Sequence, residues 1–168
     1  NMAVEQGAVA VRYPILEDVY EKIRDAVKEA IAVSDMVIIN AGSSAGRDDY
    51  TVHVLRELGE VLVHGVAIKP GKPVILAIVE GKPVIGLPGY PVSAYIAFEN
   101  FVAPVLAMMG QRELRENYEA KAVVSKRLVS SLKHKEYVRV KTGMVGDKMI
   151  AAPLARGAGA AMSLVRAD

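Results

Sequence analysis

Residues 35–51, DMVIINAGSSAGRDDYT, combine a short apolar run with a long polar loop. The run Met36–Ile39 follows a helical pattern and is typical of a buried parallel strand. The loop over 40–49 leads into a predicted helix over 50–58, for which Gly59 suits the C-terminal cap. Helix, strand, loop and helix in this order predict an α/β fold.

Upstream of this stretch, apolar residues recur at intervals of three and four, which predicts one buried face of an α-helix. Ser34 and Asp35 end that predicted helix. The residues in the pattern are Ile15, Val19, Ile23, Ala26, Val27, Ala30 and Ile31.

Downstream, residues 60–69 look strand-like, and residues 73–79 and 83–87 are typical of two paired strands around a turn at 80–82. Pro91 can open a helix because its missing N–H would be unpaired there. We expect that helix to end near Met109, with a bend at Pro104. Further strands are predicted over 118–124, 136–142 and 148–152, and a strand-like run precedes the last two residues.

These patterns predict two units. An α/β domain occupies 1–109, a charged linker 110–117, and the beginning of an all-β domain 118–168. The chain opens without a leading strand, so we expect the α/β domain to lack its first strand and the natural protein to continue at both ends.

Composition narrows the classes of function. The 168 residues are 52% hydrophobic and carry a net charge of +2, too weak a bias to indicate nucleic-acid binding. The chain has no cysteine, which excludes disulfides and thiolate metal sites. We found no apolar run of about 20 residues and no leader, and therefore expect no membrane association and a cytoplasmic location.

The loop over 40–49 has features of a ligand site. Gly42 and Gly46 let the backbone approach a ligand, and successive N–H groups can cradle an anion. Asp48 and Asp49 supply carboxylates suited to Mg²⁺. A capped strand-to-helix turn explains the same residues equally well, and the spacing of a P-loop is absent.

Two later turns also follow predicted strands. In the turn Lys69–Lys72 (KPGK), two lysines can hold phosphate or molybdate, although a solvated turn is the simpler interpretation. Residues 86–94, GLPGYPVSA, place a rigid Pro-Gly loop at a helix start, where free N–H groups can bind an anion. Simple helix initiation is the alternative. Open α/β sheets bind ligands at such strand ends.

Taken together, the motifs G-x-S-x-G-x-x-D-Y-T, A-I-K-P-G-K-P and G-L-P-G-x-P-V-S-A resemble the molybdopterin molybdenumtransferase family. The close match covers about residues 15–109, and a weaker one continues over 113–168. The resemblance implies a three-layer α/β/α molybdopterin-binding domain with a mostly parallel sheet, followed by part of a C-terminal β-barrel-like domain. It also implies molybdenum cofactor biosynthesis, in which molybdate is inserted into adenylylated molybdopterin, AMP is released and Mg²⁺ assists. A homodimer of the full-length protein is implied as well.

The resemblance assigns roles by position. It implies catalytic roles for four residues, of which Asp49 and Asp18 also bind the metal. It implies substrate binding by the motif residues and by one arginine of the second unit. The catalytic set is Asp49, Asp18, Lys69 and Lys72, and the substrate-binding set is Gly42, Ser44, Gly46, Pro88, Gly89, Pro91, Ser93 and Arg139.

The sequence departs from the family pattern at four places. Tyr90 stands where an asparagine is usual, Ala41 replaces a glycine, and Gly65 replaces a lysine found in some members. Residues 157–161 lack the usual serine and histidine. Two alternatives therefore stay open. One is a molybdopterin adenylyltransferase, although no proline follows Thr51 as that family's pattern requires. The other is a non-catalytic molybdopterin-binding module.

Overall fold

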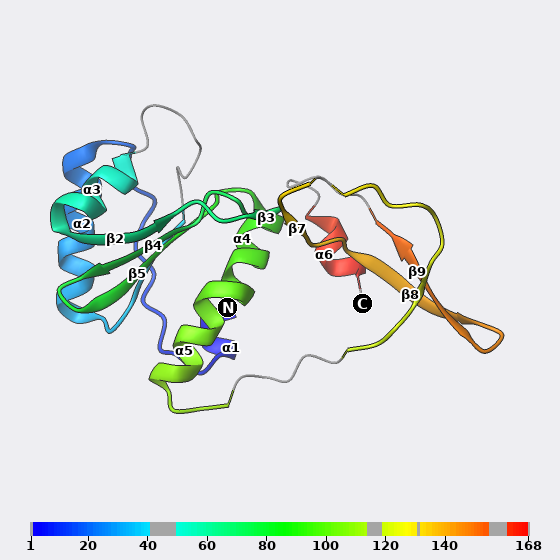
Figure 1. The fold of residues 1–168 in the computed structure, drawn as a ribbon. Coiled ribbons are helices and arrows are strands. Elements are labelled where there is room, and N and C mark those ends of the chain that lie inside the picture. Colours follow the sequence, from blue (N-terminus) through cyan, green and yellow to red (C-terminus); the bar gives the residue numbers. More distant parts are fainter. Residues whose placement is uncertain (1, 41–49, 114–118, 131, 155–160, 168) are drawn as a thin grey trace.

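The structure, a computed structural model, describes residues 2–40, 50–113, 119–130, 132–154 and 161–167. Its elements follow one another from an α/β part into a part built mainly of strands (Figure 1). In chain order they are α1 (Met2–Glu5), α2 (Tyr20–Val33), β1 (Val37–Asn40), α3 (Tyr50–Leu58), β2 (Gly59–His64), β3 (Ile68–Lys69), β4 (Ile75–Val79), β5 (Lys82–Leu87), α4 (Pro91–Ala97), the π-helical segment η1 (Phe98–Val102), α5 (Ala103–Met109), β6 (Val123–Val124), β7 (Lys135–Glu136), β8 (Val140–Val145), β9 (Lys148–Pro153) and α6 (Met162–Arg166).

The main sheet is mixed, with strand order β1-β5-β4-β2. Strands β1 and β5 pair in parallel, whereas β5–β4 and β4–β2 are antiparallel. The predicted strand pair is confirmed: Glu80 and Gly81, with φ of 50° and 75°, form the tight turn between β4 and β5. So short a connection forces antiparallel pairing, because parallel neighbours need a crossover. The α/β class is therefore confirmed, but among the described strands the expectation of a mostly parallel sheet is wrong.

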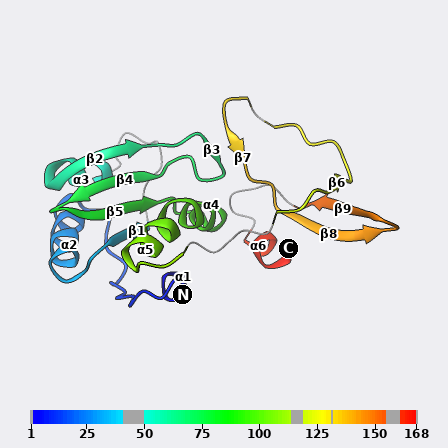
Figure 2. The same cartoon turned by 60° about the horizontal axis from the view of Figure 1, so that its bottom comes forward.

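Helices cover both faces of this sheet. One core cluster joins α2 and α3 to the sheet, with Ile31, Leu55 and Ile75 fully buried. In the other cluster, the helical run α4–η1–α5 packs on the opposite face of the sheet. The neighbouring residues Val84 and Ile85 of β5 belong to the first and the second cluster, because successive side chains of a strand point to opposite faces. Figures 1 and 2 show these layers from two directions, and they confirm the three-layer arrangement.

Helix α2 begins later than predicted. Residues 8–19 have no regular structure, Ile15 is 95% exposed, and the helix starts at Tyr20 after an extended Val19. Residues 14–19 are all exposed, so a helical turn there would bury no apolar face. From Ile23 onwards the predicted apolar face packs on the core as expected.

The helical run Pro91–Met109 is 19 residues long and, by length and composition alone, could cross a membrane. It falls just below the length of about 20 residues that a membrane span needs, so the sequence pattern did not single it out. Ala97, Phe98 and Val102 of this run are buried against the sheet, and this packing accounts for their apolar character.

The remaining elements form a smaller part around the sheet β6-β9-β8, and its long strands β8 and β9 project from the molecule (Figures 1 and 2). Strand β7 pairs instead with β3, in parallel, with Ile68 opposite Lys135 and Lys69 opposite Glu136. The strand-like run near the end is helical: α6 occupies Met162–Arg166, and its Ser163 is buried.

Candidate functional site

The three turns singled out in the sequence leave the same end of the main sheet. Asn40, the last residue of β1, pairs with Leu87, the last residue of β5. Ile75, the first residue of β4, pairs with Gly86 beside it. The segments after 40, before 75 and after 87 therefore begin at one edge. Gly42, Ser44, Gly46 and Asp49 lie outside the described residues, so only the flanks of the first turn are placed.

The second and third turns touch each other. Gly71 has φ of +110°, and a Cβ built on it would lie 3.0 Å from Ile68 Cδ1 and 3.4 Å from the Ser93 carbonyl oxygen. Ser93 itself is buried, and Ile68 packs with Val92 in a small core cluster. The turn around Gly71 thus fits against the start of α4 so closely that only glycine leaves the contact undisturbed.

The second turn is the tip of a closed loop. The N–H of Gly65 donates to the Val74 carbonyl at 2.8 Å, and the N–H of Val66 donates to the Lys72 carbonyl at 2.8 Å. At the tip the peptide bond between Lys69 and Pro70 is cis, and the two lysines are exposed. Gly65 has φ of +88°, a backbone conformation that favours glycine.

The third turn presents open backbone at the start of α4. Pro88 is buried, whereas Gly89 is exposed, and a Cβ added to it would meet no heavy atom within 4 Å. Tyr90 is 66% exposed and makes no side-chain hydrogen bond to the helix start. Pro91 is the first residue of α4, as predicted. The helix begins without a side-chain cap, which leaves its N-terminal N–H groups to other acceptors.

The β3–β7 pairing brings Arg139 toward the lysine turn. The N–H of Tyr137 donates to the Lys69 carbonyl at 2.8 Å, two residues before the arginine. Arg139 is buried, and its Nε donates to Ser163 Oγ at 2.6 Å. Burial lowers the pKa of the guanidinium from its usual value. Arg139 is thus a buried cation two residues after the backbone bond to Lys69, and a buried cation suits an anionic ligand.

Two partners in this region escaped the sequence analysis. Ser163 is 24 residues from Arg139 in sequence, and no local pattern connects them. Tyr137 lies in the predicted strand 136–142, yet its bond to Asn100 spans 37 residues and depends on the tertiary fold. The packing of the smaller part on η1 reveals Tyr137, and the packing of α6 within the smaller part reveals Ser163.

Asp18 is exposed, two residues before α2. The ring of Tyr20 packs edge-on against Tyr50, the first residue of α3, with centroids 6.1 Å apart. Tyr20 also donates a hydrogen bond from its hydroxyl to Glu57, and this bond, ahead of desolvation, raises the pKa of Tyr20. The starts of α2 and α3 are thereby held together, and Tyr50 directly follows Asp49 in sequence.

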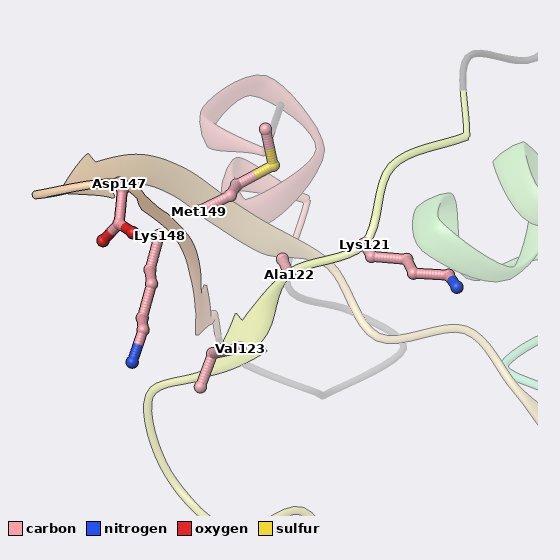
Figure 3. Close-up of a pocket in the computed structure, with 6 residues that line it drawn as sticks. All are labelled: Lys121, Ala122, Val123, Asp147, Lys148 and Met149. Atoms are coloured by element: carbon pink, nitrogen blue, oxygen red, sulfur yellow. The ribbon is translucent and has the colours of Figure 1, made fainter.

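Within the described ranges, no group of three or more acidic, histidine or cysteine side chains lies close enough to hold a metal ion. One pocket of about 300 Å³ lies on the β6–β9 side of the smaller part, lined by Lys121, Asp147 and Lys148 among others (Figure 3). Figure 3 shows Lys121 pointing away from the other two charged side chains, so this pocket gathers no common charge. A second, of about 300 Å³, is lined by Tyr95, Tyr137 and Arg139 among others and adjoins the lysine turn through Tyr137.

The fold and its turns define a class: an α/β domain whose lysine turn and Pro-Gly turn meet at one end of its sheet, where open α/β sheets bind ligands. Residues 1–108 match the family described as "Probable molybdopterin binding domain", and the chain belongs to this family.

Similar proteins share this assignment. A Methanocaldococcus jannaschii protein named for molybdopterin biosynthesis is 36% identical over 96% of this chain. The molybdopterin molybdenumtransferase of Bacillus subtilis is 30% identical over 90% of it. The chain spans only 38% and 36% of the lengths of these two relatives.

Solved structures agree on the fold. The crystal structure of a molybdopterin biosynthesis protein from Pyrococcus horikoshii superimposes with a TM-score of 0.72 at 38% identity, covering 90% of this chain and 36% of that one. A molybdenum cofactor biosynthesis protein from Pyrococcus furiosus gives a TM-score of 0.74 at 27% identity, covering 99% of this chain and 53% of that one. Both matches extend beyond residue 108, so the smaller part also resembles its counterpart in these proteins.

Proposed function

We propose that the protein acts in molybdenum cofactor biosynthesis and inserts molybdate into adenylylated molybdopterin with release of AMP. The observation that carries the proposal is the contact between the lysine turn and the start of α4, at the sheet end where residues 40–49 depart. Membership of the molybdopterin-binding family and similarity to molybdenumtransferases support it.

The proposed substrates are anionic, and the described residues supply matching charge. Lys69 and Lys72 carry exposed ammonium groups that can hold phosphate or molybdate oxygens. The N–H groups after Tyr90 open the helical run Pro91–Met109, whose positive dipole end favours an anion. Arg139 adds a buried positive charge two residues after Tyr137, whose N–H is bonded to the Lys69 carbonyl. Such groups neutralise the charge that shifts when AMP leaves.

In this proposal Asp18 and Asp49 would hold Mg²⁺, and the ion would bind the phosphates of the adenylylated substrate. Carboxylate oxygens are the ligands that this ion prefers, and it usually keeps several waters and substrate phosphates as its other ligands. Asp18 is exposed and lies two residues before Tyr20, whose ring packs against Tyr50, the residue that follows Asp49 in sequence. When bound, Mg²⁺ would reduce the charge of the phosphates.

The rest of the proposed function concerns the whole protein. The relatives are more than twice as long as this chain. We propose that the full-length protein is a cytoplasmic homodimer and that segments outside this chain complete the active site. The ligand is then a small pterin, with no role for nucleic acid or a membrane.

Two other functions compete with this one. A molybdopterin adenylyltransferase would use the same central domain, but no proline follows Thr51, and the lysine and Pro-Gly turns favour the transferase. A non-catalytic binding module is supported by Tyr90, whose exposed ring stands where the family usually has an asparagine.

Complementation separates these functions. The full-length protein should restore molybdoenzyme activity in a bacterial strain that lacks the molybdenumtransferase, and Asp49→Ala should abolish that rescue while leaving the protein folded. Rescue of an adenylyltransferase-deficient strain instead would favour the first alternative. Binding of molybdopterin without rescue of either strain would favour the module. Full rescue by the Asp49→Ala variant would overturn the site assignment.

A further inference from the structure

The helix that follows the third turn changes its geometry at η1. The Ala103 N–H donates to the Phe98 carbonyl, five residues back, instead of the four of an α-helix. Pro104 contributes to this change, because it has no N–H to donate to the Asn100 carbonyl. The predicted bend near Pro104 thus takes the form of a π-helical segment, a feature often found at functional sites.

Within η1, Asn100 makes two hydrogen bonds with its side-chain amide. Nδ2 donates to the Ile96 carbonyl at 2.7 Å, which fixes the amide on the helix surface. Oδ1 accepts a hydrogen bond from the Tyr137 hydroxyl at 2.6 Å. Both residues are half-buried. The bond therefore ties the helix of the α/β part to a residue of the smaller part.

Tyr137 is also the residue that joins the two sides of the candidate site. Its N–H donates to the Lys69 carbonyl at 2.8 Å, and Arg139 follows two residues later. The ring packs on the Ile68, Val92 and Ile96 cluster beneath the lysine turn. The Lys135 Nζ lies 5.2 Å from the centre of the same ring, a favourable cation–π distance.

The pairing of β3 with β7 is only two residues long and fixes little by itself. Four attachments meet at Tyr137: its backbone bond, its hydroxyl bond, its packing and the lysine above its ring. Because the Tyr137 ring is held at several points, the backbone of the two residues that follow it has little freedom to move. The bond to Asn100 therefore helps to fix the backbone two residues before Arg139, whose side chain is held in addition by Ser163.

We infer that Asn100 and Tyr137 are positioning residues, which hold Arg139 at a fixed place relative to Lys69 and Lys72 so that the three cations act on one anionic ligand. This inference rests on the proposed function, because it assumes that the anionic part of an adenylylated pterin binds there. Neither residue needs to touch the ligand.

The test uses the full-length protein and AMP as the probe, with affinity measured by calorimetry. Tyr137→Phe removes only the hydroxyl and should weaken AMP binding by up to about tenfold, because the contribution of one hydrogen bond sets the upper limit of the loss. Asn100→Leu should weaken it similarly, and the double variant should be no weaker than either single variant. Tyr13→Phe is the matched control: it removes a hydroxyl from a residue packed on the α2–α3 core, on the opposite face of the sheet, and AMP affinity should stay unchanged.

A purely structural role predicts a different pattern. In that case Tyr137→Phe would lower the melting temperature but leave the AMP affinity of the folded protein unchanged, which would overturn the inference. A second check uses Arg139→Gln: in that background Tyr137→Phe should cause no further loss of affinity, and an additive loss would also contradict positioning through the arginine. If the parent protein binds no AMP and fails complementation, the proposed function fails first. If the parent binds AMP and Tyr137→Phe binds it equally well, only the positioning role is lost.

Discussion

Gly71→Ala tests the contact on which the candidate site depends. The glycine has φ of +110°, and an added Cβ would lie 3.0 Å from Ile68 Cδ1 and 3.4 Å from the Ser93 carbonyl oxygen. A side chain in left-handed backbone costs about 1–2 kcal/mol. Crowding a buried isoleucine adds about 1–3 kcal/mol. We therefore expect the free energy of unfolding to fall by roughly 2–5 kcal/mol in total.

Gly81→Ala is the matched control for this variant. Gly81 has φ of +75°, but no heavy atom lies within 4 Å of its added Cβ. It therefore meets only the backbone cost of about 1–2 kcal/mol. Its turn also stands at the other end of the β4–β5 pair, away from Leu87.

Urea unfolding of the parent and the two variants measures the difference, and AMP titration of the folded proteins measures its functional consequence. Gly71→Ala should lose more stability than Gly81→Ala, and it should bind AMP more weakly because the lysine turn moves off the start of α4. Gly81→Ala should bind AMP like the parent. Equal losses of stability in both variants, with unchanged AMP affinity, would refute the close contact of the two turns.

Three further predictions follow from the described residues. Leu55→Ala should lower the free energy of unfolding, measured with urea, by about 2–5 kcal/mol, because Leu55 is fully buried. The Leu62 side chain is 55% exposed, so Leu62→Ala should change stability by no more than about 0.5 kcal/mol. Similar losses in both variants would contradict the core assignment. Lys69→Ala should weaken AMP binding most at low salt, where attraction is least screened, and a salt-independent effect would argue against a charge role. The bond to Glu57 is the first cause of the raised pKa of Tyr20, and it adds stability that is present below the ordinary tyrosine pKa near 10 and lost as pH rises through the folded pKa. Tyr20→Phe should remove this loss of stability at alkaline pH. Identical profiles of stability against pH for the two proteins would count against the bond.

Much of the fold can be predicted because local sequence patterns indicate its helices and strands. The helix over 50–58 and the strand pair around Glu80 and Gly81 come directly from apolar spacing and turn residues. The start of α2 differs from the prediction because Ile15 continues the apolar spacing although its side chain is exposed. The antiparallel direction of β4 and β5 follows from the short turn between them, although the family resemblance implies a mostly parallel sheet.

The candidate site was predictable in its residues but not in its connections. Short motifs that can be recognised in the sequence contain Lys69, Lys72 and Pro91. The contact of Gly71 with Ser93 depends on how two loops pack, and the bond of Tyr137 to Asn100 depends on how the smaller part docks. Such long-range contacts leave no periodic signal in the sequence.

A crystal structure of the full-length protein with bound AMP is the most direct measurement of how the turns serve the ligand. We predict that the phosphate lies within hydrogen-bond distance of Lys69 or Lys72, near the start of α4 and the backbone of residues 42–46. A phosphate bound elsewhere, with the first turn directed away from the other two, would contradict the proposal that the three turns form one site.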